Sequence, residues 1–252
     1  MAELTWDAVG KRFYELGSRK AVLYVQNKDG TYKPGVAWNG LISVNERREG
    51  GDQNKIYADD LPYASITTFE KFTGTITAFS YPNDFGLCDG SFSIIPGLSI
   101  SSQKRSGFAL CYRTTIGSDT KGTSEGYKLH LIYNARCSPT EKKYVTKNNE
   151  SEIIKFSWDF TTIKNSYKIR GEDRSFAYII IDSRRANRNG LSRLEECLYG
   201  NSEQTSRIPS PEEVYAFLSD EGPWAADEEN GVLYIWQSLS SSDLPNGELY
   251  IE

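Results

Sequence analysis

Residue types that catalyse reactions occur in this chain, but their spacing does not bring them together. The only histidine, His130, alternates with Leu129 and Leu131. A single histidine on such a strand-like run is more often a packing or surface residue than a ligand or a base. We therefore expect His130 to have a structural role.

One string fits a hydrolase motif. Gly122-Thr-Ser-Glu-Gly126 has the spacing of a nucleophile elbow, in which the serine lies between a strand and a helix. Here a polar, glycine-rich stretch precedes Ser124, and the β-like run 127–133 follows it. The sequence therefore predicts a hairpin with an extended tip over Gly117 to Gly126, not a nucleophile.

The cysteines form no metal-binding pattern. They stand at positions 88, 111, 137 and 197, without a CxxC pair and with one histidine in the whole chain. We expect free, mostly buried thiols in a reducing compartment. A disulfide stays open, because spacing along the chain says nothing about proximity.

Acidic pairs are the remaining candidates for chemistry. Glu195-Glu196 and Glu212-Glu213 have the residue type of acid/base groups or metal ligands, but adjacent acids on short helices are typical of solvated faces or caps. Asp227-Glu228-Glu229 lacks the ligand spacing of a calcium loop. The sequence contains no P-loop, dinucleotide fingerprint or zinc spacing. We predict no catalytic, cofactor-binding or metal site, no cofactor and no enzymatic activity.

Charge is distributed unevenly along the chain. The net charge is −5, yet residues 201–252 hold eleven acids and one base, a net of −10, which leaves 23 acids and 28 bases, a net of +5, for the rest. The best nucleic-acid candidate is the cluster Arg184, Arg185, Arg188 and Arg193. No aromatic residue lies among these arginines to stack bases, so a subunit-interface or solvated role is favoured.

Composition and turn signals predict a mainly β chain. Thr, Ser, Tyr and Gly are abundant, which is typical of strands joined by turns. The clearest strand is Ile154 to Thr161, in which apolar and polar residues alternate, so that one face is buried and the other is wet. The other predicted strands cover residues 21–25, 35–44, 56–66, 74–81, 92–95, 98–101, 107–115, 127–133, 175–182, 232–236 and 248–251.

Strand pairing and the remaining segments complete the predicted element order. The first two strands are expected to form a hairpin around Asp29-Gly30. Glu46 to Lys55 is read as a long loop, Thr67 to Phe72 as one helical turn, and Trp6 to Tyr14 as a helix or an arm. No apolar run approaches the ~20 residues of a membrane helix, and we expect no signal peptide.

Two short helices are predicted late in the chain, at 191–199 and 211–218. The second has a strong start signal: Ser210 can cap it, Pro211 suits its first position, and Glu213 completes a capping box. A helix pair of this kind behind a long β-rich body favours a structural protein over an enzyme.

Three groups of segments together resemble the major tail tube proteins of long-tailed, non-contractile (siphovirus-type) phages and related prophages. The resemblance is carried by Gly35-Val-Ala-Trp-Asn-Gly-Leu41, with 57–59, 78–82 and 88–90; by Phe108 to Thr120, with 126–133 and 156–158; and by Leu194 to Leu218. It runs from Met1 to about residue 218. The stretch 184–189 is more basic than the family pattern, and the chain after 220 has no counterpart.

The resemblance implies an antiparallel β-sandwich or partial barrel with flanking short helices, assembling into hexameric rings. The rings would stack into a tube that serves as the conduit for genome ejection, with viral DNA passing through without specific binding. Implied partners are further copies of the chain and the tape-measure, tail terminator and distal tail proteins, with no membrane. The implied location is the virion tail, and the host cytoplasm during assembly.

Domain organisation follows from where the resemblance stops. Residues 1–220 are predicted to form the tail tube β domain, and residues 221–252 an acidic C-terminal β extension that lies at the periphery. Stacking needs protruding loops, for which Glu46 to Lys55 and Gly117 to Gly126 are the candidates. The alternatives are another β-rich particle protein, such as a tail terminator, decoration or secretion-tube-like subunit, or a carbohydrate-binding module.

Overall fold

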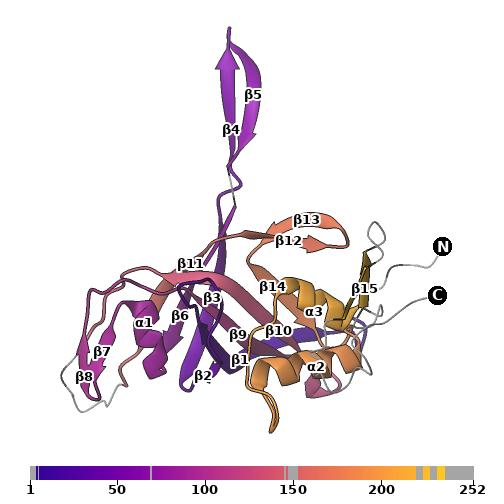
Figure 1. Ribbon diagram of the computed structural model, residues 1–252. Coiled ribbons are helices and arrows are strands. Elements are labelled where there is room, and N and C mark those ends of the chain that lie inside the picture. The colour runs from indigo at the N-terminus through magenta and orange to yellow at the C-terminus, as the bar shows by residue number, and fades with distance from the viewer. Residues whose placement is uncertain are drawn as a thin grey trace.

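A curved antiparallel sheet forms the body of the protein, and several hairpins project from it (Figure 1). The computed structural model describes residues 4, 6–68, 70–144, 146, 153–219, 224–227 and 232–235. The main sheet has the order β2-β1-β9-β10-β11-β6-β3, with β14 paired to β10. Its strands are β1 (Phe13–Val25), β2 (Val36–Ala37), β3 (Leu41–Glu49), β6 (Lys71–Ala78), β9 (Phe108–Ser118), β10 (Gly122–Cys137), β11 (Phe156–Thr162) and β14 (Tyr178–Asp182).

The long strand β10 bends the sheet into two layers. One edge of β10 pairs with β9. The other edge pairs first with β14 through Lys128–Ile132 and then with β11 through Ala135–Cys137. The register of β10 with β9 shifts between Ile132 and Ala135, where Asn134 has a φ of 51°. Irregularities of this kind increase local twist and bend. Strands β11, β6 and β3 therefore fold over the layer made by β1, β9, β10 and β14.

The main core lies between these two layers. Leu23, Leu110 and Ile132 from one layer meet Ile76 and Trp158 from the other, and all five are fully buried. Along β11 the predicted alternation is confirmed, because Trp158 and Phe160 are buried whereas Asp159 is exposed. The mainly β, antiparallel architecture with flanking helices is thus confirmed. The main sheet stays open, since its end strands β2 and β3 are not paired with each other.

Two helices cover the outer face of the first layer. Helices α2 (Arg188–Tyr199) and α3 (Pro211–Leu218) pack on this face in a second apolar cluster that includes Tyr24, Cys111, Leu131, Leu194 and Val214. The predicted capping box of α3 is confirmed: the Ser210 side chain accepts from the Glu213 N–H, and the Glu213 carboxylate accepts from the Ser210 N–H. Helix α2 starts three residues earlier than predicted, because Asn187 caps it.

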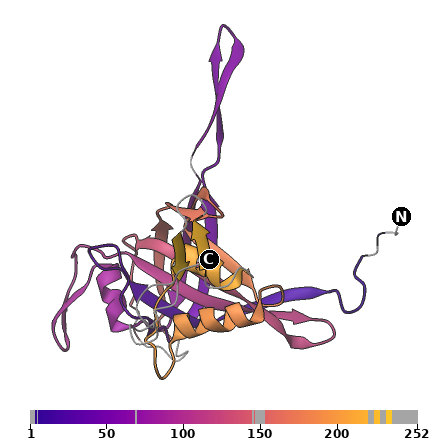
Figure 2. The same ribbon diagram turned by 45° about the vertical axis from the view of Figure 1, so that its right-hand side comes forward.

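The remaining described elements lie outside the main sheet. Short helices η1 (Asn83–Phe85) and α1 (Gly86–Asp89) precede a hairpin. The two-stranded sheets are β4 (Gln53–Ala58) with β5 (Leu61–Thr67), β7 (Phe92–Ile95) with β8 (Leu98–Ile100), β12 (Asn165–Ile169) with β13 (Glu172–Phe176), and β15 (Trp224–Asp227) with β16 (Val232–Ile235). Figures 1 and 2 show β4–β5 standing far out from the body.

The predicted loop from Glu46 to Lys55 is wrong. Residues Leu41 to Glu49 form β3, paired with β6 over its length, and only 50–52 connect it to β4. Gly50 and Gly51 both have positive φ, which suits this connection. The segment looked like a loop because its residues are charged, whereas the ladder to β6 is what makes it a strand.

Other predicted boundaries also change. The single strand expected over 56–66 is a hairpin that turns at Asp59 and Asp60, both with positive φ, and the strand expected over 175–182 is split between β13 and β14. The described residues of 67–72 contain no helical turn, and those of 6–14 contain no helix; β1 starts at Phe13. The hairpin around Asp29-Gly30 is confirmed by the β1–β2 pairing.

The β9–β10 hairpin over Gly117 to Gly126 is also confirmed, with a shorter tip at 119–121. In Figure 2 it projects beside the first half of β1. The expected strand at 248–251 lies outside the described residues, as does most of 221–252, so the domain division at residue 220 stays a prediction.

We predict that Gly190→Ala destabilises the protein although Gly190 lies in a helix. A Cβ at this position would collide with the carbonyl oxygen of Phe217 on α3. In an open helix the same change stabilises by about 1 kcal/mol, whereas overpacking costs about 1–3 kcal/mol. Urea denaturation of Gly190→Ala and of the exposed control Ser192→Ala measures the difference. A Gly190→Ala variant as stable as the wild type would contradict the close α2–α3 approach.

Candidate functional site

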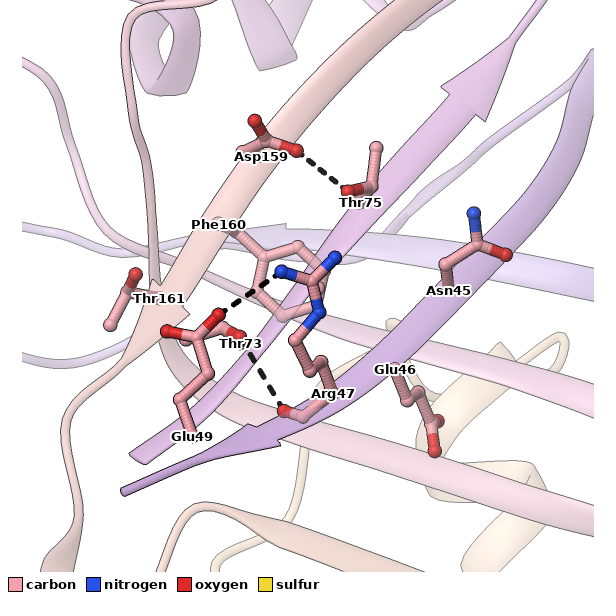
Figure 3. A pocket seen from close by; sticks show the side chains of 10 residues that line it. Asn45, Glu46, Arg47, Glu49, Thr73, Thr75, Asp159, Phe160 and Thr161 are labelled. Carbon is pink, nitrogen blue, oxygen red and sulfur yellow. Dashed lines mark hydrogen bonds and ion pairs between the residues drawn. The ribbon is translucent and has the colours of Figure 1, made fainter. Parts of the chain in front are cut away.

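The outward face of β3, β6 and β11 is polar throughout. Strand parity directs eleven residues to this face: Ser43, Asn45, Arg47, Glu49, Lys71, Thr73, Thr75, Thr77, Ser157, Asp159 and Thr161. Seven of them line a groove together with Gly74 and Phe160: Asn45, Arg47, Glu49, Thr73, Thr75, Asp159 and Thr161 (Figure 3). We call the eleven residues the polar sheet face. None of them is apolar, so this face exposes no row of apolar side chains that another chain would have to cover.

The polar sheet face carries no net charge. It holds two bases, Arg47 and Lys71, and two acids, Glu49 and Asp159, which gives 2 − 2 = 0. Arg47 pairs with Glu49 at 3.2 Å, and Thr75 donates to Asp159 at 2.6 Å. Figure 3 shows both contacts. Hydroxyls and a paired charge dominate, an arrangement that attracts neither anions nor cations strongly.

The inward side of the same strand β3 carries a carboxylate into a polar cluster. Glu46 accepts hydrogen bonds from Tyr112 on β9 and from Tyr178 on β14, the latter at 2.6 Å. His130 on β10 lies 3.4 Å from Glu46, with its Nδ1 2.5 Å from the Tyr178 hydroxyl. The Tyr112 ring stacks on the imidazole with centroids 4.6 Å apart. We call these four residues the Glu46 cluster; it joins β3 to three strands of the other layer.

Hydrogen bonding sets the ionisation of Glu46. Burial alone would raise its pKa, but the hydrogen bonds from His130, Tyr112 and Tyr178 outweigh burial, so the pKa of Glu46 is lowered. Burial, together with the neighbouring Tyr178 and Glu46, raises the pKa of Tyr112 far above its ordinary value. A charged carboxylate surrounded by neutral hydroxyl donors is therefore the stable state of the cluster.

The Glu46 cluster contains a hydroxyl–imidazole–carboxylate sequence, but lacks other parts of a hydrolytic site. Thr114 Oγ1 lies 3.0 Å from His130 Nε2. However, Thr114 lies in β9, which is paired on both sides, to Ser18 on β1 and to Lys128 on β10. Its backbone N–H is therefore directed into the ladder and not toward an oxyanion. His130 has the structural role expected, as a buried link between strands and not a surface residue.

The other serine, acid and cysteine candidates are also placed. Ser124 is exposed near the β9–β10 tip, and His130 bonds elsewhere. The four cysteines are free and buried, as predicted. Burial raises the pKa of the Cys88 and Cys111 thiols to about 12, so both stay protonated and unreactive at neutral pH. Among the described residues there is no group of three or more His, Cys, Asp or Glu positioned for a metal ion.

The Glu195 carboxylate binds side chains of the sheet and is not simply solvated. It forms an ion pair of 2.6 Å with Arg113 on β9 and accepts from Tyr127 on β10. The Arg113 guanidinium lies over the Tyr127 and Tyr199 rings, 4.2 and 4.9 Å from their centroids. These contacts fix α2 on the sheet. Of the other predicted acids, Glu196 is exposed and Glu213 caps α3, whereas Glu228 and Glu229 lie outside the described residues.

The arginine cluster is divided among several contacts. Arg184 pairs with Asp182 at 2.8 Å and lies over the Phe13 ring, and Arg193 lies over the Phe217 ring. Arg185 and Arg188 are exposed. The four side chains therefore do not form one phosphate-binding surface.

Exposed apolar side chains concentrate on the projecting elements. On β4–β5 they are Ile56, Tyr57, Leu61, Tyr63 and Ile66, with exposed fractions from 45% to 78%. On the β7–β8 hairpin they are Phe92, Ile94, Ile95, Leu98 and Ile100. Trp6 and Val9 precede β1 and are 80% and 78% exposed. Exposed apolar side chains that are gathered on one element mark contact surfaces. Sequence reading missed the first of these surfaces, because it took the base of β4 for a loop.

Comparison with solved structures gives a weak structural similarity. No protein-family model matches the sequence. No curated protein matches it either. A solved structure described as "Cryo-EM Structure of an Extracellular Contractile Injection System, PVC sheath-tube complex in extended state" aligns with 13% identity over 70% of this chain and 93% of that chain, with a TM-score of 0.27. At this TM-score a common fold is not demonstrated. Within the described residues, no helix has the length and apolar character needed to cross a membrane.

We predict that Glu46→Gln lowers the free energy of unfolding at pH 7 by about 1–3 kcal/mol, because charge-assisted hydrogen bonds are lost. The ordinary pKa of this carboxyl is 4.5, and at pH values above 4.5 the lowered pKa of Glu46 makes the folded state more stable. This added stability is lost as the pH falls below 4.5 toward the pKa of Glu46 in the folded state. The wild-type advantage should therefore shrink on acidification below pH 4.5.

Denaturant titrations at pH 7, 5, 4 and 3 test this expectation. Glu49→Gln on the polar sheet face is the matched control, and we expect it to change stability by less than about 0.5 kcal/mol. Parallel wild-type and Glu46→Gln stability curves over this range would contradict the role given to the Glu46 carboxylate.

Proposed function

We propose that this chain is the structural subunit of a phage tail tube, in which hexameric rings stack to form the conduit for genome ejection. One observation carries the proposal: a wholly polar, neutral sheet face occurs together with projecting hairpins whose apolar residues no described part of the chain covers. The resemblance of segments within 1–218 to tail tube proteins supports the same function.

The β4–β5 hairpin is the strongest sign of assembly. An isolated two-stranded hairpin is at best marginally stable in water. This one also exposes Leu61 and Tyr63 at 68% and 78%. Its apolar groups are stabilised only if another chain covers them. A further copy of the same chain is the simplest such partner, because most soluble oligomers are symmetric assemblies of one chain.

Unpaired strand edges support ring formation. Strand β3 pairs only with β6, and its other edge has no partner among the described strands. Exposed edges favour uncontrolled association, and closure into a ring removes them. In the proposed ring the free edge of β3 in one subunit meets the sheet of the neighbouring subunit.

The polar sheet face suits the wall of a DNA conduit. A wall rich in Lys and Arg would neutralise phosphates, release counterions and retain the DNA. With a net charge of 0 on this face, six subunits add no net charge to the wall. The polar sheet face is thus proposed to line the channel, while α2 and α3, on the far side of the two sheet layers, face outward.

The wider assembly follows from the same proposal. The tape-measure protein would occupy the tube during assembly, and the terminator and distal tail proteins would close its ends. The proposed location is the virion tail, after assembly in the host cytoplasm. Residues 221–252 are proposed to be a peripheral acidic extension of the tube domain 1–220.

We predict that Leu61→Ser combined with Tyr63→Ser abolishes tubes while leaving the subunit folded. Both side chains are exposed in the subunit, so their removal costs little internal stability. Negative-stain electron microscopy reports tubes and rings, and circular dichroism reports folding. Lys55→Ser on the same hairpin is the control and should still assemble.

Three outcomes of this experiment are informative. Wild-type tubes that disappear only in the double variant support the proposal. Rings that never stack would favour a terminator-like subunit. A wild-type protein that stays monomeric at every concentration and binds glycans would contradict it in favour of a carbohydrate-binding module.

A further inference from the structure

An apolar groove on the side of the molecule away from the polar sheet face lies between α3, β14 and the β12–β13 hairpin. These elements lie beside one another in Figure 1. Val214 and Leu218 of α3, Ile179 of β14 and Phe176 of β13 contribute its apolar surface. Arg174 and Arg185 also line it. The groove thus combines an apolar floor with positive charge.

The edge of β14 that lies at this groove has unused hydrogen-bonding groups. The N–H of Tyr133 donates to Ala177 O, and the N–H of Ser183 donates to Tyr127 O, which fixes the parity of the β10–β14 ladder. Tyr178 and Ile180 therefore direct their backbone N–H and C=O groups away from β10. No described residue bonds to these groups. An exposed strand edge of this kind accepts an added strand.

Charge at the groove is not balanced by the described part of the chain. Asp182 also lines the groove, but it pairs with Arg184. Arg174 pairs with Glu172 at the surface, where both side chains are more than 60% exposed. Arg185 is exposed and has no ion pair among the described residues. An acidic occupant would complement these arginines.

The chain itself contains a segment of matching chemistry. Residues 236–252 lie beyond the described part of the chain and contain three acids, Asp243, Glu248 and Glu252, and no base. In Glu248-Leu-Tyr-Ile-Glu252 the apolar Leu249 and Ile251 alternate with Glu248, Tyr250 and Glu252, as in a strand with one apolar side. Leu218, the last residue of α3, lines the groove, so α3 ends there.

We propose that residues 236–252 dock in this groove of their own chain as an added strand beside β14. Leu249 and Ile251 cover the apolar floor, Tyr178 and Ile180 pair with the added backbone, and the acids face Arg174 and Arg185. From Ile235 the segment can extend ~55 Å, and tethering gives it an effective concentration in the millimolar range. This docking does not depend on the tube assembly proposed above.

Amide exchange by NMR tests the docking in the full-length protein, at concentrations where it is dispersed. Comparison is with a chain that ends at Ile235. Truncation should accelerate exchange of the Tyr178 and Ile180 amides at least about tenfold. Exchange at Ile179 and Ile181 should not change, because their N–H groups bond to β10. Equal exchange at Tyr178 and Ile180 in the two chains would overturn the proposal, as would equal acceleration at all four positions.

Charge reversal in the full chain gives an independent test that does not rely on truncation. Arg174→Glu with Arg185→Glu should accelerate exchange at Tyr178 and Ile180, whereas Arg19→Glu, an exposed arginine on β1, should not. A synthetic peptide of residues 236–252 should restore slow exchange to the truncated chain. Failure of either result would overturn the docking. Protection that appears only as protein concentration rises would assign the groove to a second copy's segment and overturn the same-chain assignment.

Discussion

The change of partner along β10 is the constraint on which the rest of the structure depends. By pairing with β14 near Lys128–Ile132 and with β11 near Ala135–Cys137, one strand belongs to two layers. The bend buries Ile76 and Trp158 against Leu110 and leaves the outward side of β3, β6 and β11 free to be wholly polar. Without it, β11, β6 and β3 would continue the first layer and the main core would be open to solvent.

The Glu46 cluster closes the layers at the edge farthest from that bend. Strand β3 is held along one side by β6, and Glu46 ties it to β9 and β14 across the interior. The same strand continues into the β4–β5 hairpin through Gly50 and Gly51. Anchoring of Glu46 therefore fixes the base from which the hairpin projects. Partial burial opposes the charge of Glu46, but the hydrogen bonds from His130, Tyr112 and Tyr178 outweigh it, so the same contacts both stabilise and position β3.

Sequence patterns predicted the parts of the fold that local chemistry determines. The alternation around Trp158 and Phe160 and the Ser210–Glu213 capping box each act within a few residues, and both are observed. The first part of β3 falls in the strand predicted over 35–44, but its second half was missed because the inward positions there are Glu46 and Arg48, so the apolar period of a strand is absent. Its strand character comes from β6, which lies later in the chain.

The functional surfaces were predictable only in part. His130 is buried between strands, as a packing residue would be, but its partners Glu46 and Tyr178 are far away in sequence and no local pattern connects them. The polar side of β11 was visible in the alternation, whereas its extension over β6 and β3 needed the strand order. The β4–β5 hairpin was read as one strand, because apolar residues on both of its exposed sides leave no clear period.

The central claim is that the polar sheet face lines the channel of a ring. A cryo-electron microscopy map of the assembled protein tests this claim most directly. We expect six subunits per ring, with Thr75, Asp159 and Thr161 facing the pore and α2 and α3 facing outward. A pore lined by α2 and α3, or an assembly without a pore, would contradict the account.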